Sequence, residues 1–461
     1  MAYEPGMAGA ARLEEYLSVI GTHLRDRRKR ESFAMYAFGI LGEGARKSAE
    51  PIAARACGGQ DPVVAHRTHN KLLHFLARSQ WSDEIVRLEA ARYAIEEVAK
   101  HEDITTWIVD DTGFLKQGTH SVGVQRQYTG SAGKTTNCQI GVSLAVATPT
   151  QQFPVDFALY LPRSWADDDA RRAKARIPED LPFRTKTELA LEMIGRALDA
   201  GLPGEVLLAD NAYGDSAAFR HTVRFLGLDY AVGVKKGTKV VRAAADGTTK
   251  GMPLTCEELA ALPATKYKTI VWRRGTKGQL SGRFAFIRVK TMHDDGESLD
   301  QREVQWLIIQ HREDEGGDAP KFILTSLRRR MSRKESVRII MERWRTERMY
   351  QELKGELGLD HFEGRSFPGW HHHVSVVICC YAFVVAERAR SFSPSAARIG
   401  APHPHEIAAR TSLRRFLRHD QTRHSQMSDD VASSMSNMSS TASPIERVRE
   451  TLLKVGVSLR Q

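Results

Sequence analysis

The hydrophobic pattern of this chain changes its period near residue 104, and this change constrains the fold more than any other feature. Residues 1 to about 100 have the spacing of apolar residues that is typical of helices. Three strands, a helix, a strand, a helix and a strand are then expected, over 104–110, 138–148, 155–161, 186–200, 205–209, 215–225 and 230–234. Short connections favour antiparallel pairing, and the later strand–helix–strand spacing favours parallel pairing. The pattern predicts an α/β fold behind an all-α N-terminal region.

The N-terminal region contains a pair of helices with a polar outer side. One is expected to begin at Ser48 and to stop at Gly58-Gly59, and the next begins at Asp61-Pro62. The second helix directs polar residues outward and apolar residues inward: His66, Arg67, His69, Asn70 and Lys71 against Leu72, Leu73, Phe75 and Leu76. This pattern favours a helix-turn-helix that contacts DNA through Arg67 and Lys71, and the alternative is an ordinary helical hairpin.

The charge balance is basic. Lys and Arg number 67 against 56 Asp and Glu, which gives a net charge of +11. An excess of this size fits a phosphate-rich partner, although it also serves solubility alone. The five cysteines are scattered without a C-x-x-C spacing, so a disulfide framework is not expected and a reducing compartment is. The longest apolar run, 374–386, is shorter than the ~20 residues that span a membrane, and it predicts a buried core helix.

Three acidic positions far apart in the sequence are candidates for one metal site. Asp110 or Asp111 follows the first expected strand, Asp210 follows the strand 205–209, and Glu347 lies on a basic helix expected from about 332 to 355. On a continuous helix, Arg343, Glu347 and Lys354 fall within about 40° of one another. Carboxylates from different elements, with cations beside them, suit a pair of Mg²⁺ ions acting on a phosphodiester. Each acid also has an ordinary explanation, as a helix cap, a turn residue or a surface ion pair.

The first acid is ambiguous because two aspartates stand side by side. Neighbouring residues of a strand point to opposite faces, so Asp111 is expected on the face opposite Asp110. Asp110 is favoured because it leads an Asp-x-Thr pattern with Thr112, and Asp111 remains the alternative.

These residues resemble the DDE transposases of bacterial insertion sequences, of the cut-and-paste kind. The family signature is Tyr, two residues, Arg, three residues, Glu, six residues, Lys; Arg343, Glu347 and Lys354 match it, while Ile340 stands at the tyrosine position. The segments VDDTGFLKQGTHSVGVQRQYTG and LLADNAYGD resemble the blocks that carry the first and second acids.

The resemblance implies a ribonuclease-H-like core and a DNA-cleaving and DNA-joining enzyme. It implies that Asp110 or Asp111, Asp210 and Glu347 hold two Mg²⁺ ions, for which Mn²⁺ is a substitute. It further implies that Arg343 and Lys354 grip DNA phosphates, and Arg345 on the same basic helix is a further candidate for DNA contact. The expected partners are the double-stranded terminal inverted repeats, target DNA and a second copy of the chain, in the bacterial cytoplasm and at the nucleoid, without a membrane.

Composition shifts and the resemblance together predict five regions. They are a helical DNA-binding domain, the first part of the ribonuclease-H-like core, a mostly β insertion, the last part of the core with the third acid, and a helical, partly disordered C-terminal region rich in Ser and Met at 425–443. Their bounds are 1–100, 101–234, 235–330, 331–390 and 391–461.

Two further functions compete with a transposase. One is a non-enzymatic DNA-binding protein derived from a transposase, and the other is a ribonuclease-H-like nuclease that cuts without joining. Two motifs are set aside. TGSAGKTT lacks the first glycine of a nucleotide-binding loop, since Tyr128 stands there, and the adjacent His371, His372 and His373 point in different directions on a helix, as a shared metal would not allow.

Overall fold

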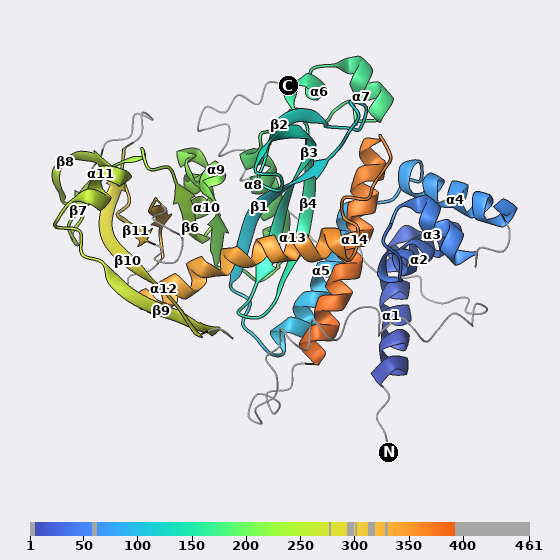
Figure 1. Cartoon of the computed structure of the whole chain (residues 1–461), viewed down its shortest axis with the longest axis horizontal. Helices are drawn as coiled ribbons and strands as arrows, with labels where there is room; N and C mark the ends of the chain where they lie inside the picture. The colour runs from blue at the N-terminus through green and yellow to red at the C-terminus, as the bar shows by residue number, and fades with distance from the viewer. Residues whose placement is uncertain are drawn as a thin grey trace, which may run out of the picture. The chain divides into compact units, whose positions relative to one another are not determined.

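The computed structural model describes residues 5–57, 62–275, 278–292, 299, 302–311, 319–327 and 331–391 (Figure 1). These residues fall into two compact units. A helical unit takes the described residues of Met1–His101, Ala175–Ile177 and Glu352–Arg447, and a sheet unit takes those of Glu102–Lys174, Pro178–Gln351 and Val448–Gln461. The five regions expected from the sequence stay a prediction, and the Ser/Met-rich segment 425–443 lies outside the described residues.

The helical unit is organised around one long apolar helix, α14 (Phe367–Arg390). The helices α1, α2, α4 and α5 contact it, and the helices of this unit that precede it are α1 (Pro5–Gly21), α2 (Arg27–Leu41), α3 (Ala49–Ala56), α4 (Pro62–Ala77) and α5 (Asp83–Ala99). Among the described residues, α14 is the helix that is long and apolar enough to cross a membrane, and 94% of its apolar window is buried inside the structure. The predicted core helix over 374–386 is therefore confirmed.

The α3–α4 pair differs from its prediction in two side chains. Ser48 precedes α3 as its N-cap residue, but its hydroxyl makes no capping hydrogen bond. The prediction that Leu73 points inward is wrong. Its side chain is 42% exposed, because the buried apolar side of α4 consists of Leu72, Phe75 and Leu76. Pro62 opens α4 as expected, whereas Gly58-Gly59 and Asp61 lie outside the described residues.

The sheet unit contains one twelve-stranded mixed sheet within the described residues. Strands β1, β5 and β6 are parallel to one another, and the remaining pairs are antiparallel. The order is β2-β3-β1-β5-β6-β12-β11-β10-β7-β8, with β4 beside β3 and β9 beside β10. The bounds are β1 (Thr106–Leu115), β2 (Gln125–Thr129), β3 (Lys134–Ala147), β4 (Gln152–Tyr160), β5 (Val206–Ala209), β6 (Asp229–Val234), β7 (Lys239–Ala243), β8 (Thr249–Thr255), β9 (Lys268–Gly275), β10 (Gly278–Thr291), β11 (Gln305–His311) and β12 (Lys321–Thr325).

The first strand does not end at its acids. β1 continues through Asp110 and Asp111 to Leu115, and it pairs with β3 along this whole length. The prediction of a strand end at residue 110 is therefore wrong. Charged residues are tolerated inside the strand because each of the two aspartates has a cationic partner from another element, Arg343 or Lys186.

The strand-rich stretch after residue 235 extends the same sheet. Its last strand, β12, pairs antiparallel with β6, and β11, β10 and β7 follow outward in the order of the sheet. A short helix, α11 (Cys256–Ala261), interrupts these strands and begins with a capping box between Thr255 and Glu258. The sheet is therefore continuous from β1 and β5 to the outer antiparallel strands β7 and β8.

The basic helix expected over 332–355 is broken in two. The chain forms α12 (Arg333–Ile340), a 3₁₀ turn η2 (Met341–Trp344) and α13 (Arg345–Gly355). The turn carries the buried Glu342, whose carboxylate meets Arg338 and Thr106. Because Arg343 lies in the tighter turn, the common-face calculation with Glu347 and Lys354 does not apply to it. Glu347 and Lys354 do share α13 and are seven residues apart, about two turns.

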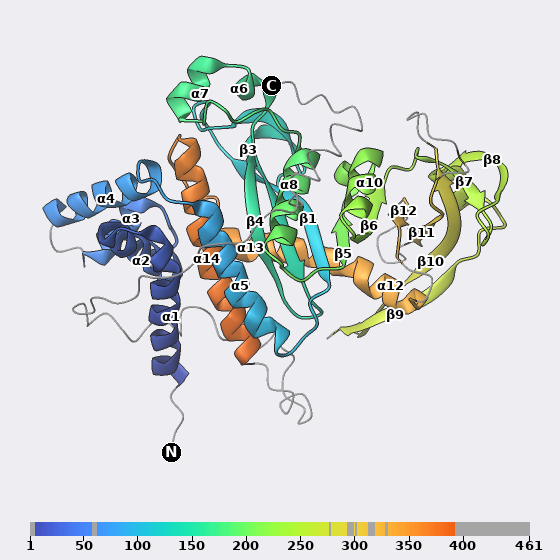
Figure 2. The same cartoon turned by 180° about the vertical axis from the view of Figure 1, so that it is seen from behind.

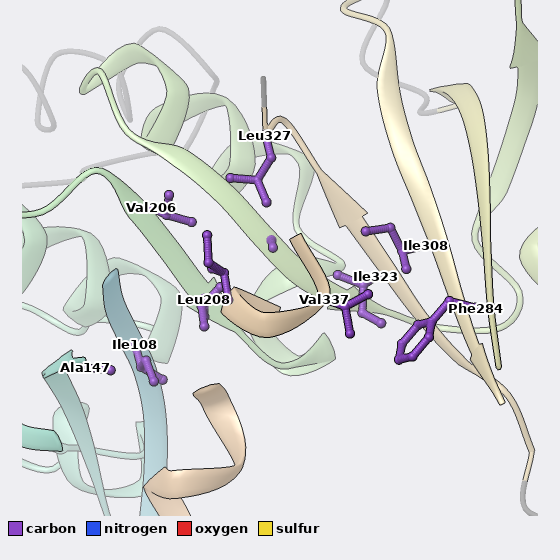
Figure 3. Packing of buried hydrophobic residues seen from close by; sticks show 11 residues of the cluster. Ile108, Ala147, Val206, Leu208, Phe284, Ile308, Ile323, Leu327 and Val337 are labelled. Carbon is purple, nitrogen blue, oxygen red and sulfur yellow. The ribbon is translucent and has the colours of Figure 1, made fainter. Parts of the chain in front are cut away.

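A hydrophobic cluster joins α12 to one face of the sheet (Figure 3). Val337 and Ile339 of α12 pack with residues from six strands: Ile108, Val206, Leu208, Ala231, Phe284, Ile308 and Ile323. On another part of the unit, α8 (Lys186–Asp199) contacts β3 and β4 (Figure 2). Remaining short helices are α6 (Arg163–Ala166), α7 (Asp169–Ala175), α9 (Asn211–Gly214) and α10 (Ala217–Phe225).

Replacing Phe284 by alanine tests this cluster. Phe284 is 1% exposed and packs edge-to-face on Trp272, so Phe284→Ala leaves a cavity and should lower the free energy of unfolding by about 3–5 kcal/mol. Phe225, in the same unit and 60% exposed, is the matched control, and Phe225→Ala should change it by less than about 0.5 kcal/mol. Denaturant unfolding measures both, and equal losses would contradict the assigned cluster.

Candidate active site

The parallel pairing of β1 with β5 places two acids beside each other. Ile108 of β1 pairs with Leu208 of β5, and the same register, continued by two residues, brings Asp110 next to Asp210. Residues in register on neighbouring strands point to the same face of a sheet. The charge of Asp210 acts on the Asp110 carboxyl, as expected for neighbours.

Asp210 has two roles at once. It follows β5 directly and is the N-cap of α9, where its Oδ1 accepts a hydrogen bond of 2.9 Å from the Ala212 N–H. Helix α9 then passes so close to β6 that a Cβ on Gly214 would lie 2.0 Å from the Gly233 carbonyl oxygen. The ordinary capping role anticipated for Asp210 is therefore present, and it also fixes the position of this carboxylate.

Asp110 is mostly buried, and each of its two carboxylate oxygens has a partner. Its Oδ2 lies 3.2 Å from Nη1 of Arg343, and its Oδ1 accepts a hydrogen bond of 2.8 Å from the Asp111 N–H. Burial raises the pKa of Asp110 to about 7; the Arg343 charge opposes this shift and the Asp210 charge adds to it. A carboxylate in this environment favours any additional cation that reaches it.

Asp111 belongs to the opposite face of β1. Lys186, in the first turn of α8, holds its Oδ2 at 2.9 Å, and the Tyr213 hydroxyl lies 3.5 Å from the same oxygen. The structure therefore separates the two aspartates: Asp110 lies with Asp210 and Arg343, whereas Asp111 is tied to α8 and α9.

Two buried hydrogen bonds anchor α13 to the Asp110 face. Ser143 of β3 pairs with Asp110 across the ladder, and its hydroxyl lies 2.6 Å from the Tyr350 hydroxyl. The Gln152 side-chain amide donates to the Thr346 hydroxyl at 2.8 Å. Burial, and next the charge of Asp110, raise the pKa of Tyr350 well above its usual value. Ser143 and Tyr350 are not predicted from the sequence, although the alternation along β3 places Ser143 on one face of its strand.

Glu347 does not join the two aspartates in a three-acid group. Its side chain is exposed on α13. Within the described ranges, no group of three or more His, Cys, Asp or Glu side chains is arranged to hold a metal ion. The structure thus brings together Asp110, Asp210 and Arg343 of the expected site, and leaves Glu347 outside this group.

The expected DNA-contact cations have different environments. Arg345 is half-buried: its Nη2 donates to the Pro149 carbonyl, and burial lowers its pKa to about 10. Arg67 is exposed on α4, whereas Lys71 pairs with Glu31 at 3.2 Å. Lys354 is half-buried near the end of α13.

Each of the three adjacent histidines has a different hydrogen-bond partner. His371 meets the Phe367 carbonyl at 3.1 Å, His372 the Leu76 carbonyl at 2.7 Å, and His373 the Tyr36 hydroxyl at 2.8 Å. Their side chains point in different directions, as predicted: His372 and His373 connect α14 to α4 and α2, whereas the His371 bond lies within α14.

Glu342 is a buried acid that sequence analysis also missed. It is 6% exposed, lies 3.3 Å from Arg338 and accepts a hydrogen bond from the Thr106 side chain. Burial raises its pKa to about 7, with Arg338 and Arg345 opposing the shift. Since Glu342 precedes Arg343 directly, this buried carboxyl anchors the backbone from which Arg343 reaches Asp110.

Comparison with known proteins identifies two likenesses. A family model described as "DDE superfamily endonuclease" matches residues 20–279, which include Asp110, Asp111 and Asp210 and end before Glu347. The "Probable transposase for insertion sequence element IS701" of Microchaete diplosiphon is 29% identical over 224 residues, which cover 48% of this chain and 53% of that protein. The chain thus matches about half the length of this relative. Both findings agree with the resemblance in the sequence motifs.

The buried Glu342 predicts a pH-dependent stability. Its pKa is higher in the folded protein than the ordinary 4.5, so the folded state binds more protons than the unfolded chain, and stability falls as pH rises from about 4.5 through 7. Glu342→Gln removes this titration. The melting temperature of the variant should therefore exceed that of the parent by a larger margin at about pH 8 than at about pH 5.

Thermal unfolding at both pH values measures the effect. Glu335→Gln on the exposed side of α12 is the control and should track the parent. A Glu342→Gln advantage that does not change with pH would contradict a buried, titrating carboxyl.

Proposed function

The chain belongs to the DDE endonuclease superfamily, and on this basis we propose that it is a transposase of a bacterial insertion sequence, which cleaves and joins the ends of its element. The observation that carries the proposal is the pair Asp110 and Asp210. The parallel pairing of β1 with β5 places them side by side, and Arg343 contacts Asp110. The arrangement of β3 antiparallel to β1, followed by the parallel β5 and β6, supports a ribonuclease-H-like core.

Enzymes of this superfamily generally use divalent metal ions. Asp110 and Asp210 fit such an ion, because they supply hard oxygen ligands and because a buried carboxyl next to a second one gains from a cation. We assign Asp110, Asp210 and Glu347 as the residues that would hold Mg²⁺, as two ions, with Mn²⁺ as a substitute. Glu347 enters through its motif spacing rather than through its position. When bound, such ions activate the attacking water or 3′-hydroxyl and stabilise the leaving oxygen.

Asp110 rather than Asp111 is the first acid of this proposal. It shares a face with Asp210 and Arg343, whereas Lys186 and Tyr213 occupy Asp111 on the other face. The protein's own residues then do three things: Ser143 and Tyr350 hold α13, Glu342 holds the turn η2, and Arg343 presents a partly exposed guanidinium beside the acids. That guanidinium suits a DNA phosphate.

The proposed partners are double-stranded terminal repeats, target DNA and a second copy of the chain, in the bacterial cytoplasm and at the nucleoid. Arg67 and Lys354 join Arg343 as proposed phosphate contacts, and Lys71 does so if DNA displaces Glu31. Arg345 is better suited to holding the loop at Pro149, since its guanidinium donates to the Pro149 carbonyl there.

An incubation of purified protein, Mg²⁺ and DNA bearing the element's terminal repeats tests the proposal. Excision with joining supports a transposase. Cutting of any DNA without joining would instead indicate a nuclease, and a mobility shift without cutting would indicate a DNA-binding protein. Binding should also weaken steeply as salt rises, because phosphate contacts release counterions.

Replacing Glu347 separates binding from chemistry. Glu347→Gln removes one charged ligand and should retain DNA binding while cleavage falls by about 10³-fold. Gel shift and cleavage assays with the same terminal-repeat DNA measure both. Glu356→Gln, an exposed acid just beyond α13, should behave as the parent. Cleavage retained by Glu347→Gln would remove this residue from the site.

The two adjacent aspartates should respond differently to the same substitution. Asp110→Asn should abolish cleavage with little loss of stability, since a neutral isostere suits a buried position. Asp111→Asn should keep cleavage and lower stability by about 1 kcal/mol through the lost Lys186 ion pair. Cleavage assays and thermal unfolding decide between them, and the reverse result would exchange the two roles.

A further inference from the structure

We infer that Arg343 is a positioning residue that competes with the divalent ion: its guanidinium and the ion bind the same oxygen of Asp110, so that metal binding releases Arg343 toward the DNA. The inference rests on the proposed function, because it assumes that Asp110 is a metal ligand. It adds a direct antagonism between a cation of the protein and the catalytic ion.

Of the two carboxylate oxygens of Asp110, Oδ2 is the one for which Arg343 and a divalent ion would compete. Oδ1 accepts the Asp111 N–H at 2.8 Å, a local bond to the next residue of the strand. Oδ2 is the oxygen that Arg343 holds, at 3.2 Å from Nη1. A divalent ion binds a carboxylate oxygen at about 2.0–2.1 Å in the case of Mg²⁺. A guanidinium on that same oxygen would then lie a few ångströms from the ion, where like charges repel.

The Arg343 contact is of a kind that exchanges easily. It is a single Nη1–Oδ2 contact rather than a bidentate fork, and the Arg343 side chain is 40% exposed against 19% for Asp110. Single, partly exposed ion pairs contribute little stability because water screens them. Arg343 can therefore leave Asp110 without a large cost to the fold.

The backbone around Arg343 is, by contrast, held firmly. Glu342 is buried against Arg338 and Thr106, and Thr346 accepts the Gln152 amide at 2.8 Å. These contacts flank Arg343 on both sides along the chain. An exchange at Asp110 thus requires a rotation of the Arg343 side chain and no movement of η2 or α13.

Such an exchange would connect two binding events. A ligand that binds one side-chain arrangement better shifts the protein toward it. Metal at Asp110 favours the released Arg343, and a DNA phosphate that takes the guanidinium frees Asp110 for metal. Each ligand should therefore strengthen the binding of the other by the same factor.

The test measures Mn²⁺ binding to the full-length protein without DNA, from the loss of the free Mn²⁺ signal in electron paramagnetic resonance. Arg343→Gln removes the competitor and should bind Mn²⁺ about twofold to fivefold more tightly than the parent. Arg343→Lys keeps a cation and should stay closer to the parent. Arg333→Gln is the matched control, because Arg333 lies on α12, stacks on Phe286 and does not contact Asp110.

Three outcomes have distinct meanings. Tighter Mn²⁺ binding by Arg343→Gln, and not by Arg333→Gln, supports the exchange. Equal or weaker binding by Arg343→Gln overturns it while leaving the proposed function intact. If the parent binds no Mn²⁺ and also cleaves no DNA, the proposed metal site and the exchange fail together. Thermal unfolding of each variant confirms the fold, and Arg343→Met provides a second neutral variant if the glutamine variant is unstable.

Discussion

The parallel pairing of β1 with β5 is the constraint on which the site depends. Its register brings Asp110 beside Asp210 in a mostly buried position, where two like charges are costly. The chain offsets this cost locally. Asp110 receives a backbone N–H and the Arg343 guanidinium, and Asp210 receives the backbone N–H of Ala212 at the start of α9.

On each face of β1, a buried or partly buried aspartate is paired with a cation from another element. Asp110 and Asp111 point to opposite faces, and each meets a cation from a different helical segment: Arg343 of η2 on one face, Lys186 of α8 on the other. Two adjacent charges inside a strand are therefore neutralised without ending the strand. This explains why β1 continues to Leu115, where a local pattern of charge after an apolar run indicates a strand end.

The sequence predicts the features that depend on short-range patterns. The order of strands and helices, Pro62 at the start of α4 and the core helix α14 all follow from local periodicity and capping chemistry. The missed features depend on contacts between residues far apart. Ser143 meets Tyr350, 207 positions away, and the buried Glu342 accepts a hydrogen bond from Thr106 of β1. The 3₁₀ turn at η2 has no Gly or Pro in it or next to it, so the local sequence contains no signal for this interruption of the helix.

Glu347 is exposed on α13 and lies outside the group formed by Asp110, Asp210 and Arg343. A third carboxylate placed against Asp110 and Asp210 would add a like charge to a pair that has Arg343 as its cation, and would raise the pKa of the buried carboxyl further. On α13, Tyr350 enters the buried side and Glu347, one turn earlier, stays in water. The motif spacing places Glu347 on α13, whose Tyr350 meets Ser143 beside Asp110, and a cation bound to the two aspartates would lower the electrostatic cost of a third carboxylate there.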